Sequence, residues 1–193
     1  MEKLKERILK DGRVAGDGIL KVDTFLNHQI DVGLMEEIGE EFYNRFKDAG
    51  ITKVLTIEAS GIAIAAFVAR ALKVPLLFAK KSTSKNMDGE ILTSPVRSYT
   101  KGLTYLVSVA GKFLGPEDRI LLIDDFLANG SALLGLADIV GKSGATVAGA
   151  GIVIEKSFQP GRKRAEEAGL DVCSLVRISA IKDGRVTFLE EDA

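Results

Sequence analysis

The segment covering residues 119–132 constrains the fold of this chain more than any other. Four consecutive apolar residues, 120–123, indicate a strand buried on both faces, as in a parallel sheet. Two carboxylates, Asp124 and Asp125, stand where this strand is expected to end. Apolar residues at helical spacing follow after a short loop. The segment therefore predicts a strand–loop–helix unit of an α/β domain.

The loop of this unit has the residues of an anion site. Gly130 allows the backbone to approach a ligand closely, and Ser131 can cap the helix or donate its hydroxyl. Unpaired N–H groups at a helix start attract phosphate, whereas adjacent carboxylates suit ribose hydroxyls or hydrated Mg²⁺. Together these groups indicate a phosphorylated sugar as ligand. The alternative is an ordinary turn with a solvated carboxylate pair and a capping serine.

Strand and helix patterns alternate along most of the chain. Strands are expected at residues 53–57, 74–79, 104–109, 120–123, 144–154, 172–178 and 186–189, and helices at 61–72, 132–140 and 162–168. This alternation predicts right-handed βαβ units and a mostly parallel central sheet with flanking helices. At 193 residues the chain is long enough for one substantial core, so 1–193 is predicted to be a single domain.

Two segments stand apart from this pattern. Residues 1–33 are predicted to form a cap appended to that core, with a helix at 4–10 and an extended stretch at 18–23. Asp31 is expected to cap the next helix, whose apolar residues recur at helical spacing and which stops near Gly50. Residues 80–101 lose all periodicity, over a length that is uncommon for a connection within a compact domain. Long loops of this kind are typically lids or binding loops, or are disordered.

Composition excludes several classes of protein. The formal net charge of −1 and the lack of a Lys/Arg cluster backed by aromatics give no footprint for nucleic acid. The longest apolar run, 61–69, is too short to span a bilayer, and the charged N-terminus has no signal-peptide pattern. The single cysteine, Cys173, excludes an internal disulfide and is expected to be a small core residue. We therefore expect a cytoplasmic protein without nucleic-acid or membrane partners.

The segment 119–132 resembles the signature of the type I phosphoribosyltransferases, which bind 5-phospho-α-D-ribose 1-diphosphate (PRPP). In that signature two acidic residues follow an apolar strand and precede a Thr-Gly loop; here Asn129 replaces the threonine. The resemblance implies the α/β fold of this family and a catalytic role for Asp124 and Asp125. It also implies that these carboxylates bind Mg²⁺, directly or through water.

A second loop, 58–61, resembles the pyrophosphate loop of adenine phosphoribosyltransferases, with Ser60 in place of the usual Arg. Family members often hold a non-proline cis peptide there. The basic pair Lys80 and Lys81 follows the next strand, and the aperiodic segment resembles the hood that closes over PRPP, with Arg97, Ser98 and Tyr99 as candidates for contact. The residues that the resemblance implies for PRPP binding are Glu58, Ala59, Ser60, Gly61, Lys81, Ala128, Asn129, Gly130, Ser131 and Ala132.

The purine site is expected after the strand that ends near residue 154. In hypoxanthine-guanine enzymes a lysine there donates to O6 of the purine and an aromatic ring stacks on the base; Lys156 and Phe158 match these positions. Adenine has a donor at that place, so Lys156 favours a 6-oxopurine. However, Ala128 stands where hypoxanthine-guanine enzymes usually have an Asp, as in adenine and xanthine enzymes.

The combination of Ala128 and Lys156 resembles the xanthine phosphoribosyltransferases that group with the adenine type, over essentially the whole chain. In that group the cap closes over the base, and residues matching Leu20 and Asn27 contact it. His28, the single histidine, lies beside Asn27 but is expected to be a surface or packing residue.

The resemblance implies a homodimeric purine-salvage enzyme that joins xanthine to PRPP, giving xanthosine 5′-monophosphate and pyrophosphate. Hypoxanthine/guanine or adenine remain alternative substrates. A PRPP-sensing regulator without turnover is the alternative from another class, although no winged-helix extension or basic face accompanies the domain here.

Overall fold

The computed structural model of the chain describes residues 1–16, 18–81, 89–97 and 103–189. The helices are α1 (Glu2–Asp11), α2 (Val32–Phe46), α3 (Ser60–Leu72), α4 (Ser131–Lys142) and α5 (Gly161–Glu167), with a 3-10 helix η1 (Gly111–Phe113). The strands are β1 (Arg13–Ala15), β2 (Ile19–Lys21), β3 (Lys53–Ile57), β4 (Leu76–Ala79), β5 (Ile91–Arg97), β6 (Thr104–Ala110), β7 (Arg119–Leu127), β8 (Thr146–Lys156), β9 (Val172–Lys182) and β10 (Arg185–Phe188). Within these residues no helix has the length and apolar character needed to cross a membrane.

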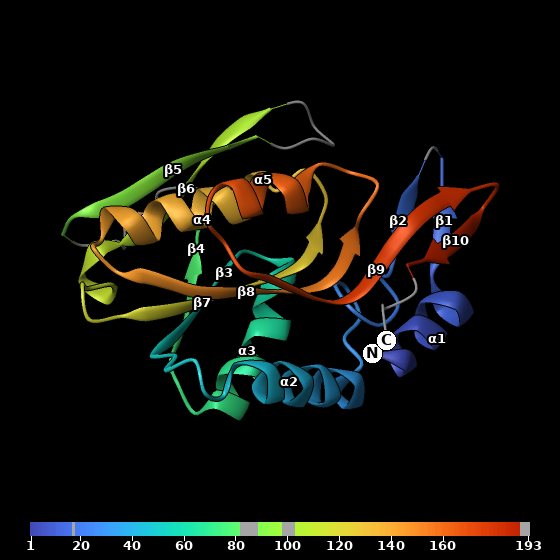
Figure 1. Cartoon of the computed structure of the whole chain (residues 1–193), viewed down its shortest axis with the longest axis horizontal. Helices are drawn as coiled ribbons and strands as arrows, with labels where there is room; N and C mark the ends of the chain where they lie inside the picture. Colours follow the sequence, from blue (N-terminus) through green and yellow to red (C-terminus); the bar gives the residue numbers. More distant parts are fainter. Residues whose placement is uncertain (17, 82–88, 98–102, 190–193) are drawn as a thin grey trace.

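A six-stranded sheet with the order β10-β9-β8-β7-β3-β4 forms the centre of the molecule (Figure 1). All neighbouring pairs are parallel except β9–β10, so the predicted mostly parallel sheet is confirmed. The chain runs from β3 outward to β4, and later from β7 through β8 to β9 in the opposite direction. The strand order therefore reverses between β3 and β7, where ligands of such sheets bind beyond the carboxyl ends of the strands.

Alternate residues of β7 feed two separate hydrophobic cores. Leu121 and Ile123 pack into a core shared with α2 and α3, whereas Ile120 and Leu122 pack into a core shared with α4. The two helix layers lie on opposite faces of the sheet in Figure 1. Burial on both faces explains why this strand has an unbroken apolar run in the sequence.

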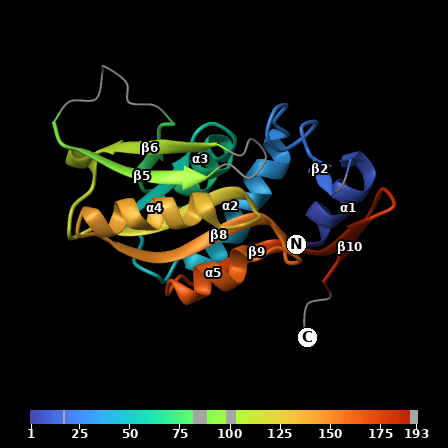
Figure 2. The same ribbon diagram turned by 90° about the horizontal axis from the view of Figure 1, so that it is seen from above.

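The N-terminal segment packs beside the β9–β10 end of the sheet, as seen from above in Figure 2. Leu4, Ile8, Phe25 and Leu26 are fully buried or nearly so and belong to the same core as α2 and α3. Asp31 caps α2 as predicted, because its Oδ1 accepts a hydrogen bond of 3.1 Å from Leu34 N. The segment is thus joined to the main core by apolar packing.

The prediction that residues 80–101 form an unstructured loop is wrong for 91–97. These residues form β5, which pairs antiparallel with β6 in a hairpin outside the central sheet. Only one face of this edge strand is buried, and its buried residues are Leu92, Ser94 and Val96. Because the middle one is a polar serine, the alternation of apolar residues was not visible in the sequence. Pro95 is compatible with an edge strand. Ser98 and Tyr99 lie outside the described residues.

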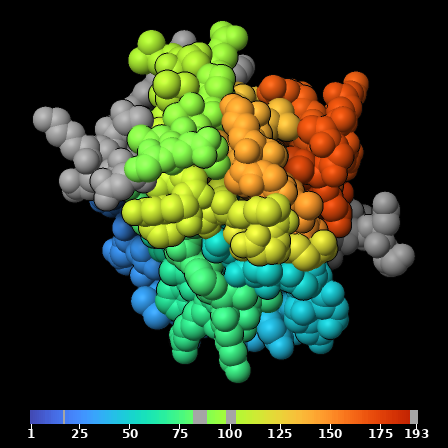
Figure 3. Space-filling model, turned by 90° about the vertical axis from the view of Figure 1, so that its left-hand side faces the viewer, coloured from blue at the N-terminus to red at the C-terminus, as the bar shows by residue number. Residues whose placement is uncertain are grey.

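The hairpin lies along α4, as Figures 2 and 3 show from two directions. Gly135 of α4 permits this contact, because a β-carbon there would overlap the side chain of Val96. Lys142 Nζ donates to Thr93 O at 2.8 Å. The bridge between Lys80 and Ser108 joins β6 to the end of β4. The hairpin is therefore fixed at both α4 and the central sheet.

Several strands extend further than the sequence predicts, and two of them, β7 and β8, carry predicted site residues. β7 continues through the acidic pair to Leu127, and β8 continues to Lys156, because their backbones stay paired up to the contact of Leu127 with Glu155. The carboxylates of Asp124 and Asp125 and the ammonium of Lys156 are therefore carried by strands instead of loops. This makes their backbone positions part of the sheet.

Candidate active site

The carboxyl ends of four parallel strands gather the predicted site residues. The loop 58–61 follows β3, Lys81 follows β4, the loop 128–130 follows β7, and Lys156 ends β8. The strand order places these segments next to one another across the reversal between β3 and β7. The topology thus brings together residues that lie up to about a hundred positions apart in the sequence.

Asp124 and Asp125 are nearly buried, with exposed fractions of 6% and 8%. Asp124 Oδ1 accepts a hydrogen bond of 2.9 Å from Asp125 N, and Asp125 Oδ1 accepts one of 3.1 Å from Phe126 N. Asp125 Oδ2 also accepts a hydrogen bond of 3.0 Å from Asn27 Nδ2. The cap residue Asn27 therefore reaches the acidic pair directly.

The two carboxylates have an unequal electrostatic environment. Burial, together with the charge and hydrogen bonding of Asp125, raises the pKa of Asp124 well above its ordinary value, and the nearby Lys81 partly opposes this. A buried carboxylate with a raised pKa is disfavoured in its ionised form. A cation bound here would relieve the repulsion between the two carboxylates. Such an unequal buried pair is typical of a binding site.

The loop after β7 has the backbone geometry of an anion site. Gly130 adopts φ 80°, and the first helical hydrogen bond of α4 is donated by Leu134 N to Gly130 O at 3.0 Å. The N-cap residue is Gly130, and Asn129 Oδ1 accepts a hydrogen bond of 2.9 Å from Ser131 N just before the helix. Of the two roles considered for Ser131, capping of the helix is not observed, and donation of its hydroxyl to a ligand stays a prediction.

A pocket of about 190 Å³ opens at this loop. It is lined by residues 128–133 together with Val96, Arg97, Tyr105, Asp124, Phe126 and Leu127. The start of α4, one carboxylate of the pair and the end of the β5–β6 hairpin thus face one space. N–H groups, a cation and a carboxylate around one pocket suit a ligand with phosphate and hydroxyl groups.

The loop after β3 packs tightly against this region. The Glu58–Ala59 peptide is cis, as expected from the resemblance. A β-carbon at Gly61 would overlap Thr56 Oγ1 and lie 3.6 Å from Asp124 Oδ1, so only glycine fits at this position. Glu58 Oε1 accepts a hydrogen bond of 2.6 Å from Lys81 N, and this bond joins the loop to the end of β4.

Tyr105 is a site residue that the sequence analysis missed. Its ring centroid lies 5.5 Å from Lys81 Nζ, and its pKa is raised by burial and by the charge of Asp124. Tyr105 and Arg97 come from the two paired strands of the hairpin, at the end that borders the pocket. Recognising the hairpin would have found Tyr105, because Arg97 was already a candidate.

On the purine side, Lys156 is half-buried, and burial lowers its pKa. Its Nζ donates 3.1 Å to Gly18 O of the N-terminal segment and lies 5.6 Å from the centroid of the Phe126 ring. Phe126 is therefore the aromatic residue beside this ammonium, and the predicted stacking of Phe158 on the base stays a prediction. Phe158 is 46% exposed in the turn after β8.

The remaining predicted purine contacts stay predictions. The side chain of Leu20 is buried in the core that contains α2 and α3, and Asn27 bonds to Asp125. His28 is exposed in the loop beside Asn27, as expected for a surface residue.

The residues of the site fit Mg²⁺ that arrives with a phosphorylated ligand. No group of three or more His, Cys, Asp or Glu side chains able to hold a metal occurs among the described residues. Mg²⁺ commonly keeps several waters and is bound through one or two carboxylates plus substrate phosphates. Asp124 and Asp125 supply those two carboxylates, and burial together with the charge of Asp125 raises the pKa of Asp124.

Comparisons with known proteins identify the family of the chain. The family model described as Phosphoribosyl transferase domain matches residues 22–182. A xanthine phosphoribosyltransferase of Streptococcus pneumoniae (strain CGSP14) is 58% identical over 192 residues, and one of Streptococcus agalactiae serotype Ia is 58% identical over 193 residues. In both comparisons 100% of each chain is covered.

Solved structures with a similar fold include adenine phosphoribosyltransferases. The enzyme of Giardia lamblia complexed with 9-deazaadenine has a TM-score of 0.77 at 21% identity, covering 90% of this chain and 97% of that one. The enzyme of Thermoanaerobacter pseudethanolicus has a TM-score of 0.74 at 20% identity, covering 90% and 99%. At this identity the likeness is one of fold. The sequence match over residues 22–182 and the full-length relatives show that the chain belongs to the phosphoribosyl transferase domain family.

Proposed function

We propose that this protein transfers the 5-phosphoribosyl group of PRPP to xanthine. A ring nitrogen of xanthine forms a bond to C1 of the ribose while the bond from C1 to pyrophosphate breaks, giving xanthosine 5′-monophosphate and pyrophosphate. The observation that carries this proposal is the full-length identity of 58% to xanthine phosphoribosyltransferases, in a chain whose acidic pair, phosphate loop and Lys156 meet at one sheet edge. Hypoxanthine, guanine or adenine transfer and PRPP sensing without turnover are less well supported.

PRPP binding is assigned to three groups of residues. The 5-phosphate is held by the backbone of residues 128–132 and by the Ser131 hydroxyl, because the start of α4 offers N–H donors there. The ribose hydroxyls are held by Asp124 and Asp125. The pyrophosphate is received by residues 58–61 and Lys81, together with Arg97 of the hairpin.

These residues act on the reaction mainly by positioning and electrostatics. The fixed carboxylates orient the ribose, and the cations of Lys81 and Arg97 stabilise the negative charge that develops on the leaving group. Bound with PRPP, Mg²⁺ supplies further positive charge at the pyrophosphate. Tyr105, Val96 and Arg97 of the hairpin line the pocket, so they would displace water from the side of the ligand that they contact.

The base site is assigned to Lys156, Phe126, Asn27 and Leu20, with Phe158 as a further candidate. The ammonium of Lys156 donates to O6 of the purine and is repelled by the exocyclic amine of adenine. Burial lowers the pKa of this ammonium, which donates a hydrogen bond to Gly18 O and lies beside the Phe126 ring. Lys156 is therefore a partly desolvated hydrogen-bond donor. We propose further that residues 1–33 cap the base, and that the enzyme acts as a cytoplasmic homodimer.

The test is an activity assay with PRPP, Mg²⁺ and each of the four bases xanthine, guanine, hypoxanthine and adenine. We expect product formation to be fastest with xanthine. Faster turnover with another base would overturn the substrate, and calorimetric binding of PRPP without turnover of any base would favour the sensing alternative.

Replacing Lys156 by Ala tests the assignment of the base site. Loss of a hydrogen bond from a charged group should lower kcat/KM for xanthine by about ten- to a hundredfold, with a smaller change for adenine. Steady-state kinetics with both bases measures this. Lys182→Ala, at the exposed end of β9, is the control. A Lys156→Ala variant that keeps its preference for xanthine over adenine would contradict the assignment.

A further inference from the structure

The loop that follows β7 rests on the start of α5 through backbone contacts. Gly161 N donates to Ala128 O at 2.9 Å. A β-carbon at Gly161 would overlap this same oxygen, and one at Gly130 would lie 3.1 Å from Gly161 O. The two backbones can approach this closely only because both positions are glycine.

A side chain of α5 fixes the next carbonyl of the loop. Arg164 Nη1 donates to Asn129 O at 2.6 Å. Two successive carbonyl groups, those of Ala128 and Asn129, are therefore held by α5. Among the described residues only the Glu58–Ala59 peptide is cis, so the peptides 128–129 and 129–130 are trans.

The direction of the carbonyl groups decides the direction of the amides. In a planar trans peptide the C=O of one residue and the N–H of the next point in opposite directions. Holding Ala128 O and Asn129 O toward α5 therefore turns the N–H groups of Asn129 and Gly130 away from it. The pocket lies there, since it is lined by residues 128–133 and by no residue of α5.

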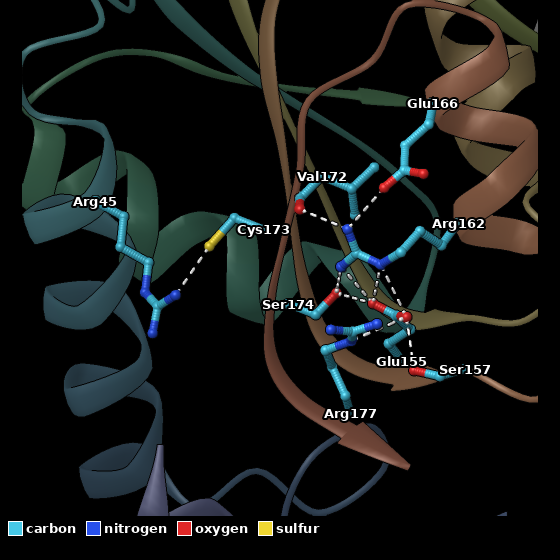
Figure 4. A network of polar contacts seen from close by, with 9 residues as sticks. All are labelled: Arg45, Glu155, Ser157, Arg162, Glu166, Val172, Cys173, Ser174 and Arg177. Carbon is cyan, nitrogen blue, oxygen red and sulfur yellow. Dashed lines mark hydrogen bonds and ion pairs between the residues drawn. The ribbon is translucent and has the colours of Figure 1, made fainter. Parts of the chain in front are cut away.

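The helix α5 is itself held in place by a buried ion pair (Figure 4). Arg162 Nη2 donates to Glu155 Oε2 at 2.6 Å, and its Nη1 donates to Val172 O at 3.1 Å. Ser174 Oγ donates a hydrogen bond of 2.6 Å to the same carboxylate, and Glu155 is only 1% exposed. The neighbour of Gly161 is thus anchored to β8 and β9, which makes α5 a fixed support.

We propose that Arg164 is a positioning residue for PRPP, which acts by orienting the backbone amides of the phosphate loop. The inference rests on the proposed function, because it assigns those amides to the 5-phosphate of PRPP. Arg164 acts through the Asn129 carbonyl, to which its Nη1 donates. The start of α5 and the Arg164 side chain together define the direction of two phosphate-binding N–H groups.

The test compares Arg164→Ala, Arg164→Lys and the control Lys163→Ala. Lys163 is the neighbouring exposed cation, whose ion-pair partner is Glu167 at 3.8 Å, so its removal changes the charge of α5 equally. We expect Arg164→Ala to raise the KM for PRPP, and its calorimetric Kd, about fivefold, in line with the loss of one hydrogen bond. KM for xanthine, kcat and Tm should stay unchanged, and Arg164→Lys should recover part of the loss.

Four outcomes would overturn the inference. They are an unchanged KM for PRPP in Arg164→Ala, an equal rise in Lys163→Ala, no recovery in Arg164→Lys, or a fall in Tm without a change in KM. If the wild-type protein binds no PRPP, the proposed function fails and this inference fails with it. If the wild-type protein binds PRPP and Arg164→Ala binds it equally well, this inference alone fails.

Discussion

Replacing Asp125 by Asn should lower kcat by about two orders of magnitude or more, because a preorganised charge is removed from the ribose site. The fold should be retained, since asparagine has nearly the same shape and its single side-chain oxygen can still accept one of the two hydrogen bonds, from Phe126 N or from Asn27 Nδ2, that the two carboxylate oxygens accept in the wild type. Steady-state kinetics with PRPP and xanthine, alongside a thermal melt, measures both effects.

Asp48→Asn is the matched control, because Asp48 is exposed at the end of α2 and far from the sheet edge in sequence and topology. It should leave kcat unchanged. Near-full activity in Asp125→Asn would show that the ribose site is wrongly assigned, even if xanthine proves to be the substrate.

Asp124→Asn should be equally inactive but more stable than the wild type in the absence of ligands. The raised pKa of Asp124 means that its ionised form is disfavoured in the folded protein, so folding stability is lost as the pH rises from the ordinary value of 3.8 through the folded pKa. Asparagine removes this charge. A lower Tm in Asp124→Asn would contradict the electrostatic description of the pair.

The largest effect on stability is expected at Glu155. Burial opposes its ionisation, but hydrogen bonds from Arg162, Ser174 and Ser157 hold its pKa at about 2, against an ordinary value of 4.5. Glu155→Gln leaves two arginines facing a neutral amide, since Arg177 Nε also donates to this carboxylate at 3.3 Å. Breaking a buried pair in this way should lower the free energy of unfolding by about 3 kcal/mol or more, measured by urea denaturation.

Glu166→Gln is the control for this variant. Glu166 pairs with the same Arg162 at 3.2 Å, but its side chain is 55% exposed, so its loss should cost at most about 0.5 kcal/mol. Equal losses in the two variants would show that burial does not set the strength of the pair.

The same pKa gives the pH dependence of stability. Because the folded pKa of Glu155 lies below its ordinary value, its contribution is complete above about pH 4.5 and is lost as the pH falls toward 2. The stability difference between wild type and Glu155→Gln should therefore shrink over this range. A difference that stays constant down to pH 2 would rule out linkage to this carboxylate.

Much of the fold could be predicted because its signals are local. The run 120–123 is apolar since β7 is buried on both faces, and the helical periodicity of α2 follows from the face that it packs into the core. The β5–β6 hairpin could not be predicted, because β5 is covered on a single face and buries Ser94 among its apolar residues. Its pairing with β6 depends on contacts with residues distant in the sequence, and the local pattern of apolar residues does not show it.

By itself the sequence determined the strand–loop–helix unit around the acidic pair, since residue type and spacing there are sufficient to specify a buried strand, a glycine turn and a helix start. Only the tertiary structure decided which distant residues join that unit. Tyr105, Phe126 and Arg164 contribute through strand pairing and helix docking, which depend on the whole core. The orientation of a loop carbonyl toward α5 is likewise invisible in the sequence, because a side chain 35 positions away sets it.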